Sequence, residues 1–165
     1  MRKLLFILML LPALCFAKVS PTEAKAIYDR IVQANNITDA PKLYYDGRDI
    51  INAYTYEDGK GAIVIFKGIL DRYNTNEIAL VLAHELGHWH NRGHEKPFFM
   101  EYVSDRYGFY ASQKAGYNPC LGAHILWTFG NEASKTHPPG HERWRVLTLH
   151  CGIPTPKDIS VYVAH

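Results

Sequence analysis

The spacing of hydrophobic and polar residues predicts that the folded part of this chain begins with a helix. Between Ala24 and Val32, apolar residues recur every three or four positions, the spacing that gives a helix one buried face. The preceding sequence Ser20-Pro21-Thr22-Glu23 combines a capping residue, a first-turn proline and a capping box. A helix is therefore expected from about residue 21 to Gln33.

Three short segments that follow have the pattern of strands. They are rich in β-branched and aromatic residues, which pack well on a pleated sheet, and turn residues separate them. Asp46-Gly47 marks the first turn and Asp58-Gly59-Lys60-Gly61 the second. The predicted strands lie within Pro41–Tyr45, Ile50–Tyr56 and Gly61–Phe66.

The remainder of the chain has helical spacing, interrupted by proline and glycine. A capping box at Asn74-Thr75-Asn76-Glu77 begins a long helix that should end near Asn91, and Pro97 ends this region. Residues 153–165 are expected to form a loop with at most a short strand. One helix, a small sheet and then several helices predict an α+β fold. The later helices are expected at Glu101–Lys114, Pro119–Phe129 and Glu142–His150.

The first 17 residues have a pattern of their own. Two basic residues precede the apolar run Leu4–Leu14, which is shorter than a membrane-spanning helix. Cys15 and Ala17 are small residues at the third and first positions before the bond that would be cleaved, as at a signal-peptide cleavage site. A signal peptide over residues 1–17 is therefore expected, with cleavage after Ala17, leaving Lys18–His165 as a single domain. An uncleaved membrane anchor and a lipid on Cys15 are the alternatives.

Charge and cysteine content narrow the class of protein. Two of the 18 basic residues and none of the 16 acidic ones lie in the predicted signal peptide, so the mature chain has no net charge. This balance argues against a nucleic-acid partner, and no integral membrane span is expected in the mature chain. Cys120 and Cys151 remain after cleavage and are expected to form a disulfide in an oxidising compartment. Two buried thiols are the alternative.

The sequence HELGHWHNRGH at residues 84–94 carries the most specific chemistry. His84 and His88 are four residues apart on the predicted helix, so both imidazoles can reach one metal ion. Glu85 follows the first histidine and can take a proton from a water molecule at the metal. The apolar sequence IALVLA before the motif fits a buried helix better than a surface helix rich in histidine. One zinc ion per chain is therefore predicted.

Two residues compete as the third zinc ligand. His94 has the spacing of the metzincin motif HExxHxxGxxH, with Asn91 in place of its glycine. Only Met100 follows, which is too soon for the separate methionine turn of that class. Glu101 and Asp105 are four residues apart on the next predicted helix and share one face. Glu101 could bind zinc while Asp105 accepts the N–H of a histidine ligand, and a solvated acidic face is the alternative.

Four blocks of sequence resemble the HtpX-like and CAAX-prenyl-protease-type zinc metallopeptidases. They are NAYTYEDGKGAIVIFKGIL, LVLAHELGH, EYVSDRYGFYASQKAGYNP and THPPGHERWRVL, which together cover about residues 50–149. The resemblance implies a zincin-like fold, in which a small sheet edges a helical domain. It also implies roles for five residues: the zinc ligands His84, His88 and Glu101, the base Glu85 and the supporting carboxylate Asp105.

This chain departs from many members of that family in one respect. Only twelve residues separate His88 from Glu101, where many members carry a much longer insertion, and no membrane span lies in this region. The resemblance therefore implies a stripped, exported version of the enzyme. Membrane-protein substrates of the kind that the family cleaves do not follow from it.

The last block contains one more histidine that the resemblance brings near the site. His137 belongs to the His-Pro pair of this block and could stabilise the developing oxyanion or bind zinc in a resting form. Arg143 follows in the same block and is expected either to orient it through a carboxylate or to be an ordinary surface arginine. His90 and His94 are expected to be solvated at the helix end, and His124 to be packed in the core.

Together these features predict an exported zinc metalloendopeptidase, periplasmic or secreted, that hydrolyses protein or peptide substrates. The substrate is expected to pair with the Gly61–Phe66 strand, because in the resembling family that strand edges the cleft. Three alternatives stay open: a metzincin-type peptidase that uses His94, a zinc-bearing binding or regulatory module without activity, and a hydrolase of another amide such as a cell-wall peptide. The sequence indicates no particular oligomeric state.

Overall fold

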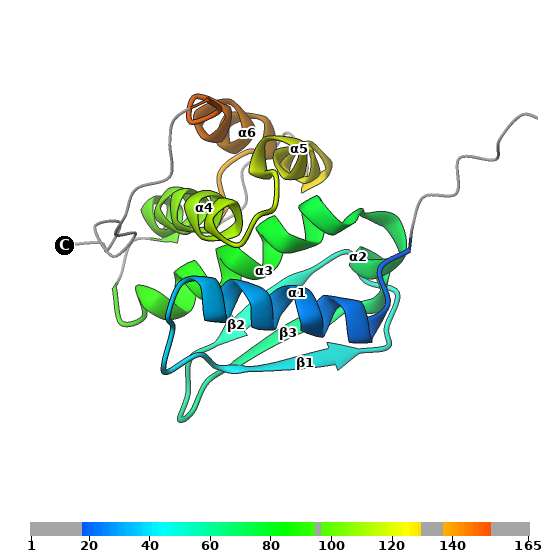
Figure 1. Ribbon diagram of the computed structural model, residues 1–165. Coiled ribbons are helices and arrows are strands. Elements are labelled where there is room, and N and C mark those ends of the chain that lie inside the picture. The colour runs from blue at the N-terminus through cyan, green and yellow to red at the C-terminus, as the bar shows by residue number, and fades with distance from the viewer. Residues whose placement is uncertain (1–17, 95–96, 130–136, 153–165) are drawn as a thin grey trace, which may run out of the picture.

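The computed structural model describes residues 18–94, 97–129 and 137–152, and these form a mixed α+β fold. The predicted signal peptide and the expected C-terminal loop lie outside the described residues. Helices α1 (Pro21–Ala34) and α3 (Thr75–His90) cover one face of a small sheet, and α4 (Pro97–Lys114) packs against α3 on the side away from the sheet (Figure 1). Helix α3 is therefore the central element of the described part of the molecule.

The sheet contains three strands, as expected from the sequence, in an order that the sequence does not reveal. Strand β3 (Ala62–Phe66) lies between β1 (Lys42–Asp46) and β2 (Ala53–Tyr56). It pairs in parallel with β1 and antiparallel with β2, so that Val64 stands opposite Tyr44 on one side and Tyr54 on the other. The two segments on either side of the Asp46-Gly47 turn are therefore not neighbours.

The expected caps fix the ends of the two helices on the sheet. The Ser20 side chain accepts a hydrogen bond from the backbone N–H of Glu23 at 3.1 Å, and α1 begins at the next residue after Ser20. At the start of α3, the Asn74 side chain accepts from the backbone N–H of Glu77 at 3.3 Å, and the Glu77 carboxylate accepts from the N–H of Asn74 at 2.8 Å. Both predicted capping boxes thus coincide with observed helix starts, and that of α3 is complete.

One short helix is absent from the sequence-based prediction. Helix α2 (Lys67–Arg72) begins directly after β3 and buries Ile69 and Leu70. It packs closely on the preceding loop, where a Cβ atom added at Gly68 would lie 2.5 Å from the carbonyl oxygen of Ile50. Six residues are too few to show helical periodicity, which explains why the pattern did not indicate it.

The later helices exist where expected but differ in their limits. Helix α4 begins at Pro97, four residues before the predicted start, because proline is well suited to the first turn of a helix. The helix predicted over Pro119–Phe129 consists of α5 (Pro119–Gly122) followed by a 3₁₀ helix, η1 (Ala123–Phe129). The last predicted helix corresponds to α6, which spans Gly140–Thr148. The predicted Cys120–Cys151 disulfide is confirmed, with Cα atoms 5.9 Å apart.

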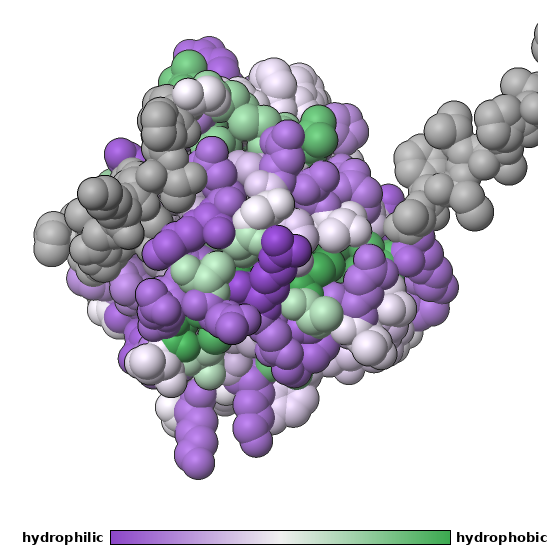
Figure 2. Space-filling view, in the orientation of Figure 1, coloured by the Kyte–Doolittle hydropathy of each residue, from purple (hydrophilic) through white to green (hydrophobic). Residues whose placement is uncertain are grey.

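The surface and the helices give two further observations. The face seen in Figure 2 is mostly hydrophilic, and its hydrophobic residues form small separate groups. Among the described residues, no helix combines the length and the apolar composition that crossing a membrane requires.

Candidate metal centre

Helix α3 carries three residues of the predicted site on one buried stretch. His84 and Glu85 are buried and His88 is partly buried. The spacing of four residues places His84 and His88 one turn apart, and their Nε2 atoms lie 2.9 Å from each other. Because two neutral imidazole nitrogens with lone pairs repel each other at this distance, the pair requires a proton or a cation between them.

Helix α4 brings a carboxylate to the same point. Glu101 lies with Oε1 3.2 Å from Nε2 of His88 and Oε2 3.6 Å from Nε2 of His84. One ligand atom from each of these three residues lies within 4.8 Å of the others. Among the described residues, this is the group of three histidine, cysteine or acidic side chains that lie close enough together to hold a metal ion.

The donor set fits a catalytic zinc ion. Two imidazole nitrogens and one carboxylate are the ligands of many catalytic zinc sites, in which a fourth position stays open. The Oε2 atom of Glu101 is buried and makes no hydrogen bond, but Nη1 of Arg143 lies 2.8 Å away and forms an ion pair with it. A carboxylate oxygen that is ion-paired and not hydrogen-bonded keeps lone pairs available for a metal ion.

Asp105 lies one turn after Glu101 and orients the first histidine. Its Oδ1 atom is 2.9 Å from Nδ1 of His84, and the carboxylate is buried. Nδ1 must carry the proton to donate to this oxygen, which leaves the lone pair on Nε2 available for a metal ion. The structure therefore brings together all five residues that the sequence assigned to the site.

Arg143 reaches this cluster from α6 and is buried. Of its two expected environments, contact with a carboxylate is the one found, and that of an ordinary surface arginine is wrong. Its Nε and Nη2 atoms lie 2.8 and 2.6 Å from the two oxygens of Asp105, and Nη1 lies 2.8 Å from Oε2 of Glu101. The guanidinium thus joins two carboxylates of α4 in a fork that suits its planar geometry. The sequence indicated a carboxylate partner as one alternative but did not identify which residue supplies it.

These contacts keep both carboxylates ionised. Burial disfavours the charged form of Glu101, but the hydrogen bond from His88 and the charges of His84 and Arg143 outweigh it, and they lower the pKa of Glu101 from 4.5 to about 2. The pKa of Asp105 is also lowered, because Arg143 outweighs the effect of burial. The same ion pairs raise the pKa of Arg143 against its own burial.

Close contact between α3 and α4 allows the carboxylates to reach the histidines. A Cβ atom added at Gly108 would lie 2.8 Å from the backbone nitrogen of His84, and one added at Gly87 would lie 2.8 Å from Cα of Ser104. The backbones of α3 and α4 are therefore in contact at Gly87 of α3 and at Gly108 of α4. Glycine inside two helical stretches was the available signal for this contact, because glycine costs helix stability and needs a packing reason there.

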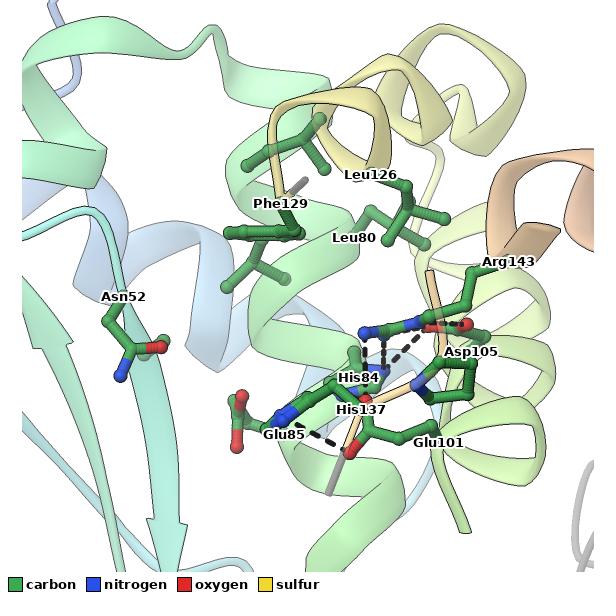
Figure 3. Close-up of a pocket in the computed structure, with 14 residues that line it drawn as sticks. Asn52, Leu80, His84, Glu85, Glu101, Asp105, Leu126, Phe129, His137 and Arg143 are labelled. Carbon is green, nitrogen blue, oxygen red and sulfur yellow. Dashed lines mark hydrogen bonds and ion pairs between the residues drawn. The ribbon is translucent and has the colours of Figure 1, made fainter. Parts of the chain in front are cut away.

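A pocket of about 240 Å³ opens beside the cluster. Figure 3 shows its two parts: Leu80, Leu126 and Phe129 form an apolar wall, and His84, Glu85 and Glu101 lie at the polar end. Asn52 and Ala53 border the pocket from the sheet side. Apolar walls with a few convergent polar groups are typical of sites that bind organic ligands.

Glu85 faces this pocket without belonging to the ligand group. Its carboxylate Oε2 lies 2.8 Å from the hydroxyl of Thr55 on β2. The sequence did not indicate Thr55, because the two residues come from elements that only the tertiary fold brings together.

The remaining histidines have different environments. His137 borders the pocket, with its side chain 57% exposed and Nε2 3.6 Å from Oε1 of Glu101. His94 is exposed beyond the end of α3 and is not in the ligand group. His90 is partly buried and stacks on Tyr107 at 5.0 Å, so it is not the solvated residue that was expected.

The expectation that His124 is packed in the core is wrong. Its side chain is 74% exposed and lies 3.5 Å from Glu77. The residue belongs to η1, in which Ala123, Ile125 and Leu126 take the buried positions. The tighter winding of a 3₁₀ helix changes which positions face inward, and the α-helical spacing used for the prediction does not apply there.

The position of β3 also corrects the expected mode of substrate binding. Because β3 is hydrogen-bonded to β1 on one side and to β2 on the other, it has no free edge along Ala62–Phe66. The strand edge beside the pocket belongs to β2, the outer strand of the sheet on that side.

The sequence of residues 20–100 matches the model of peptidase family M48. The matched segment contains the sheet, His84, Glu85 and His88, and it ends one residue before Glu101. No curated protein and no solved structure was found to match the chain. The resemblance is confirmed for the part of the chain that the match covers: residues 20–100 match peptidase family M48, the family that includes the HtpX-like and CAAX-protease-type zinc metallopeptidases.

Proposed function

We propose that this protein is an exported zinc-dependent endopeptidase in which His84, His88 and Glu101 hold the metal. The match to peptidase family M48 supports metallopeptidase activity. The observation that carries the proposal is the convergence of these three side chains at the polar end of a pocket that Glu85 also borders. A zinc ion held there would supply Lewis acidity toward a water molecule and toward the scissile carbonyl group.

Glu85 acts as the general base. Its carboxylate takes a proton from the attacking water and delivers it to the leaving amine. A purely structural zinc site has four protein ligands and needs no such base. The buried position of Glu85 at the pocket therefore favours an enzyme over a zinc-bearing binding module.

The carboxylates and Arg143 set the charge of the site. Asp105 and the guanidinium of Arg143 form a buried pair of opposite charges, which leaves Glu101 as the one anionic ligand. Two neutral histidines and one carboxylate would leave a bound divalent ion with a net positive charge, which its Lewis acidity requires.

We place the substrate along the edge of β2 that pairs with no other strand among the described residues. An extended peptide can add to an exposed strand edge through main-chain hydrogen bonds, and Asn52 and Ala53 at this edge border the pocket. The apolar wall of Leu80, Leu126 and Phe129 would accept a bulky apolar side chain next to the scissile bond. His137 borders the pocket, and we assign it the role of donating a hydrogen bond to the developing oxyanion.

Export forms part of the proposal. The predicted signal peptide ending at Ala17 and the Cys120–Cys151 disulfide both suit a periplasmic or secreted protein, because disulfides persist in oxidising compartments.

The decisive experiment compares the wild type with Glu85→Gln, using zinc-loaded mature protein and unfolded casein labelled with a self-quenching fluorophore. Both proteins should bind one zinc ion per chain and melt at similar temperatures. Hydrolysis should fall by roughly 10²–10⁴-fold in the variant, since general-base catalysis contributes about that much. Near-normal turnover by a zinc-replete Glu85→Gln protein would contradict the mechanism. Chelator-resistant hydrolysis by the wild type would contradict the role of the metal.

A further inference from the structure

Strand β2 contributes one side chain that points at the proposed base. Residues alternate between the two faces of a strand, and in β2 the exposed tyrosines Tyr54 and Tyr56 face away from the helices. Thr55 lies between them, opposite the fully buried Ile63 of β3. It therefore faces the helical layer, where α3 presents Glu85.

The hydroxyl of Thr55 lies against two oxygen atoms of Glu85. Its Oγ1 atom is 2.8 Å from the backbone carbonyl oxygen and 2.8 Å from carboxylate Oε2. A hydroxyl group has one proton to donate and two lone pairs to accept with. The backbone carbonyl oxygen and the ionised carboxylate oxygen can both accept this one proton.

We propose that Thr55 is a positioning residue that holds the Glu85 side chain at the pocket, where its hydroxyl donates a hydrogen bond to Oε2 of the carboxylate. This inference rests on the proposed function, because it assigns Thr55 a role only if Glu85 is the base.

The geometry makes such a contact specific. The hydroxyl donates to the side chain of Glu85 while lying 2.8 Å from the backbone carbonyl oxygen of the same residue, so it holds the carboxylate close to the helix that carries His84 and His88. The β-branched threonine has few χ1 rotamers, and the strand holds its backbone. One carboxylate oxygen is thereby held, and the other is left to face the attacking water.

Loss of the hydroxyl should affect turnover and leave metal and substrate binding intact. Without it, Glu85 can adopt other rotamers, and a smaller fraction of molecules presents the base correctly. We expect kcat to fall about 10- to 100-fold, the usual value of a hydrogen bond to a charged group. KM and zinc stoichiometry should not change, because Thr55 is not in the ligand group.

The test uses Thr55→Val, which has nearly the same shape and a high strand propensity, together with Thr55→Ser, which restores the hydroxyl. Thr75→Val is the matched control, because its hydroxyl also approaches a glutamate, 3.4 Å from Glu23, at the distant start of α3. Wild type, all three variants and Glu85→Gln are assayed with zinc and labelled casein. Crystal structures of the metal-free Thr55→Val and Thr55→Ser proteins report the position of the Glu85 carboxyl group independently of activity.

The expected result is a low kcat in Thr55→Val only, near-normal kcat in Thr55→Ser and Thr75→Val, and a Glu85 carboxyl group that is displaced in Thr55→Val alone. Full kcat in Thr55→Val with an unmoved Glu85 would overturn the role of Thr55 and leave the proposed function standing, provided that Glu85→Gln is inactive. A wild type that hydrolyses nothing would overturn both. An equal loss in Thr55→Ser and Thr55→Val would show that the hydroxyl is not the cause.

Discussion

At the scale of single residues, the charged side chains beside the two histidines of the site are paired with each other. Arg143 pairs with Asp105 through two contacts and with Glu101 through a third. Burial of so many charges is costly unless each finds a partner. The two histidine Nε2 atoms lie 2.9 Å apart beside this cluster. A cation at that point completes the balance.

The choice between the two candidate third ligands gives a direct prediction. Glu101→Gln should weaken zinc binding by more than the roughly 10- to 100-fold that loss of a supporting carboxylate costs, because a neutral amide replaces the anionic ligand. His94→Gln should leave zinc affinity unchanged, since His94 is exposed beyond α3. Competition with a chelating dye measures both affinities. Equal losses in the two variants would restore the metzincin alternative.

The residues of this site differ in how far they could be predicted. His84, Glu85 and His88 lie within one turn of one helix, so their spacing alone indicates a shared metal. Glu101 and Asp105 required the assumption that the next helix packs against the first. The contacts of Arg143 and Thr55 join residues 38 and 30 positions apart. They depend on tertiary packing that no local pattern encodes.

At the scale of secondary structure, the site depends on how closely α4 approaches α3. A side chain at Gly108 would meet the backbone nitrogen and Cα of His84 at 2.8 and 3.0 Å. Backbone atoms cannot rotate away as a side-chain end can, so any Cβ atom there must push the helices apart. The carboxylates of α4 would move with their helix.

Gly108→Ala should therefore weaken zinc binding by roughly 10-fold or more, as disturbance of supporting groups does. Overpacking costs about 1–3 kcal/mol, but alanine gains about 1 kcal/mol over glycine in a helix. The melting temperature is accordingly a weaker readout than metal affinity. Gly47→Ala is the control, because no atom lies within 4 Å of its Cβ position. Unchanged zinc affinity in Gly108→Ala would show that the helix contact does not set the site.

Periodicity predicted the elements better than their arrangement. The three strands and the helices at α1, α3 and α4 were recognisable because apolar residues repeat at the strand or helix period. The position of β3 between β1 and β2 could not be predicted. The alternation of residues along a strand does not depend on which strand lies beside it. The 3₁₀ winding of η1 was also missed, and with it the exposure of His124.

At the scale of the whole molecule, the charged cluster is assembled from two helices that lie far apart in the sequence. Helix α4 supplies Glu101 and Asp105, and α6 supplies the guanidinium of Arg143. The Cys120–Cys151 disulfide joins α5 to the residues just after α6, across 31 positions of sequence. It therefore fastens the helix that carries Arg143 to the part of the chain that follows α4.

Removal of this bridge by the double substitution Cys120→Ser and Cys151→Ser should lower the free energy of unfolding by about 3–4 kcal/mol, the chain-entropy value for a loop of this length. For a domain of this size, the melting temperature should fall by roughly 10 °C. Scanning calorimetry of metal-free protein measures the change. The wild type in reductant is the matched control: it should melt near the double variant, whereas the double variant should not respond to reductant. If the oxidised wild type and the double variant melted together, the bridge would contribute nothing to stability.

The ion pairs of Arg143 would then be the main attachment of α6 to α4, and Arg143→Met should lower the melting temperature more than loss of the disulfide does.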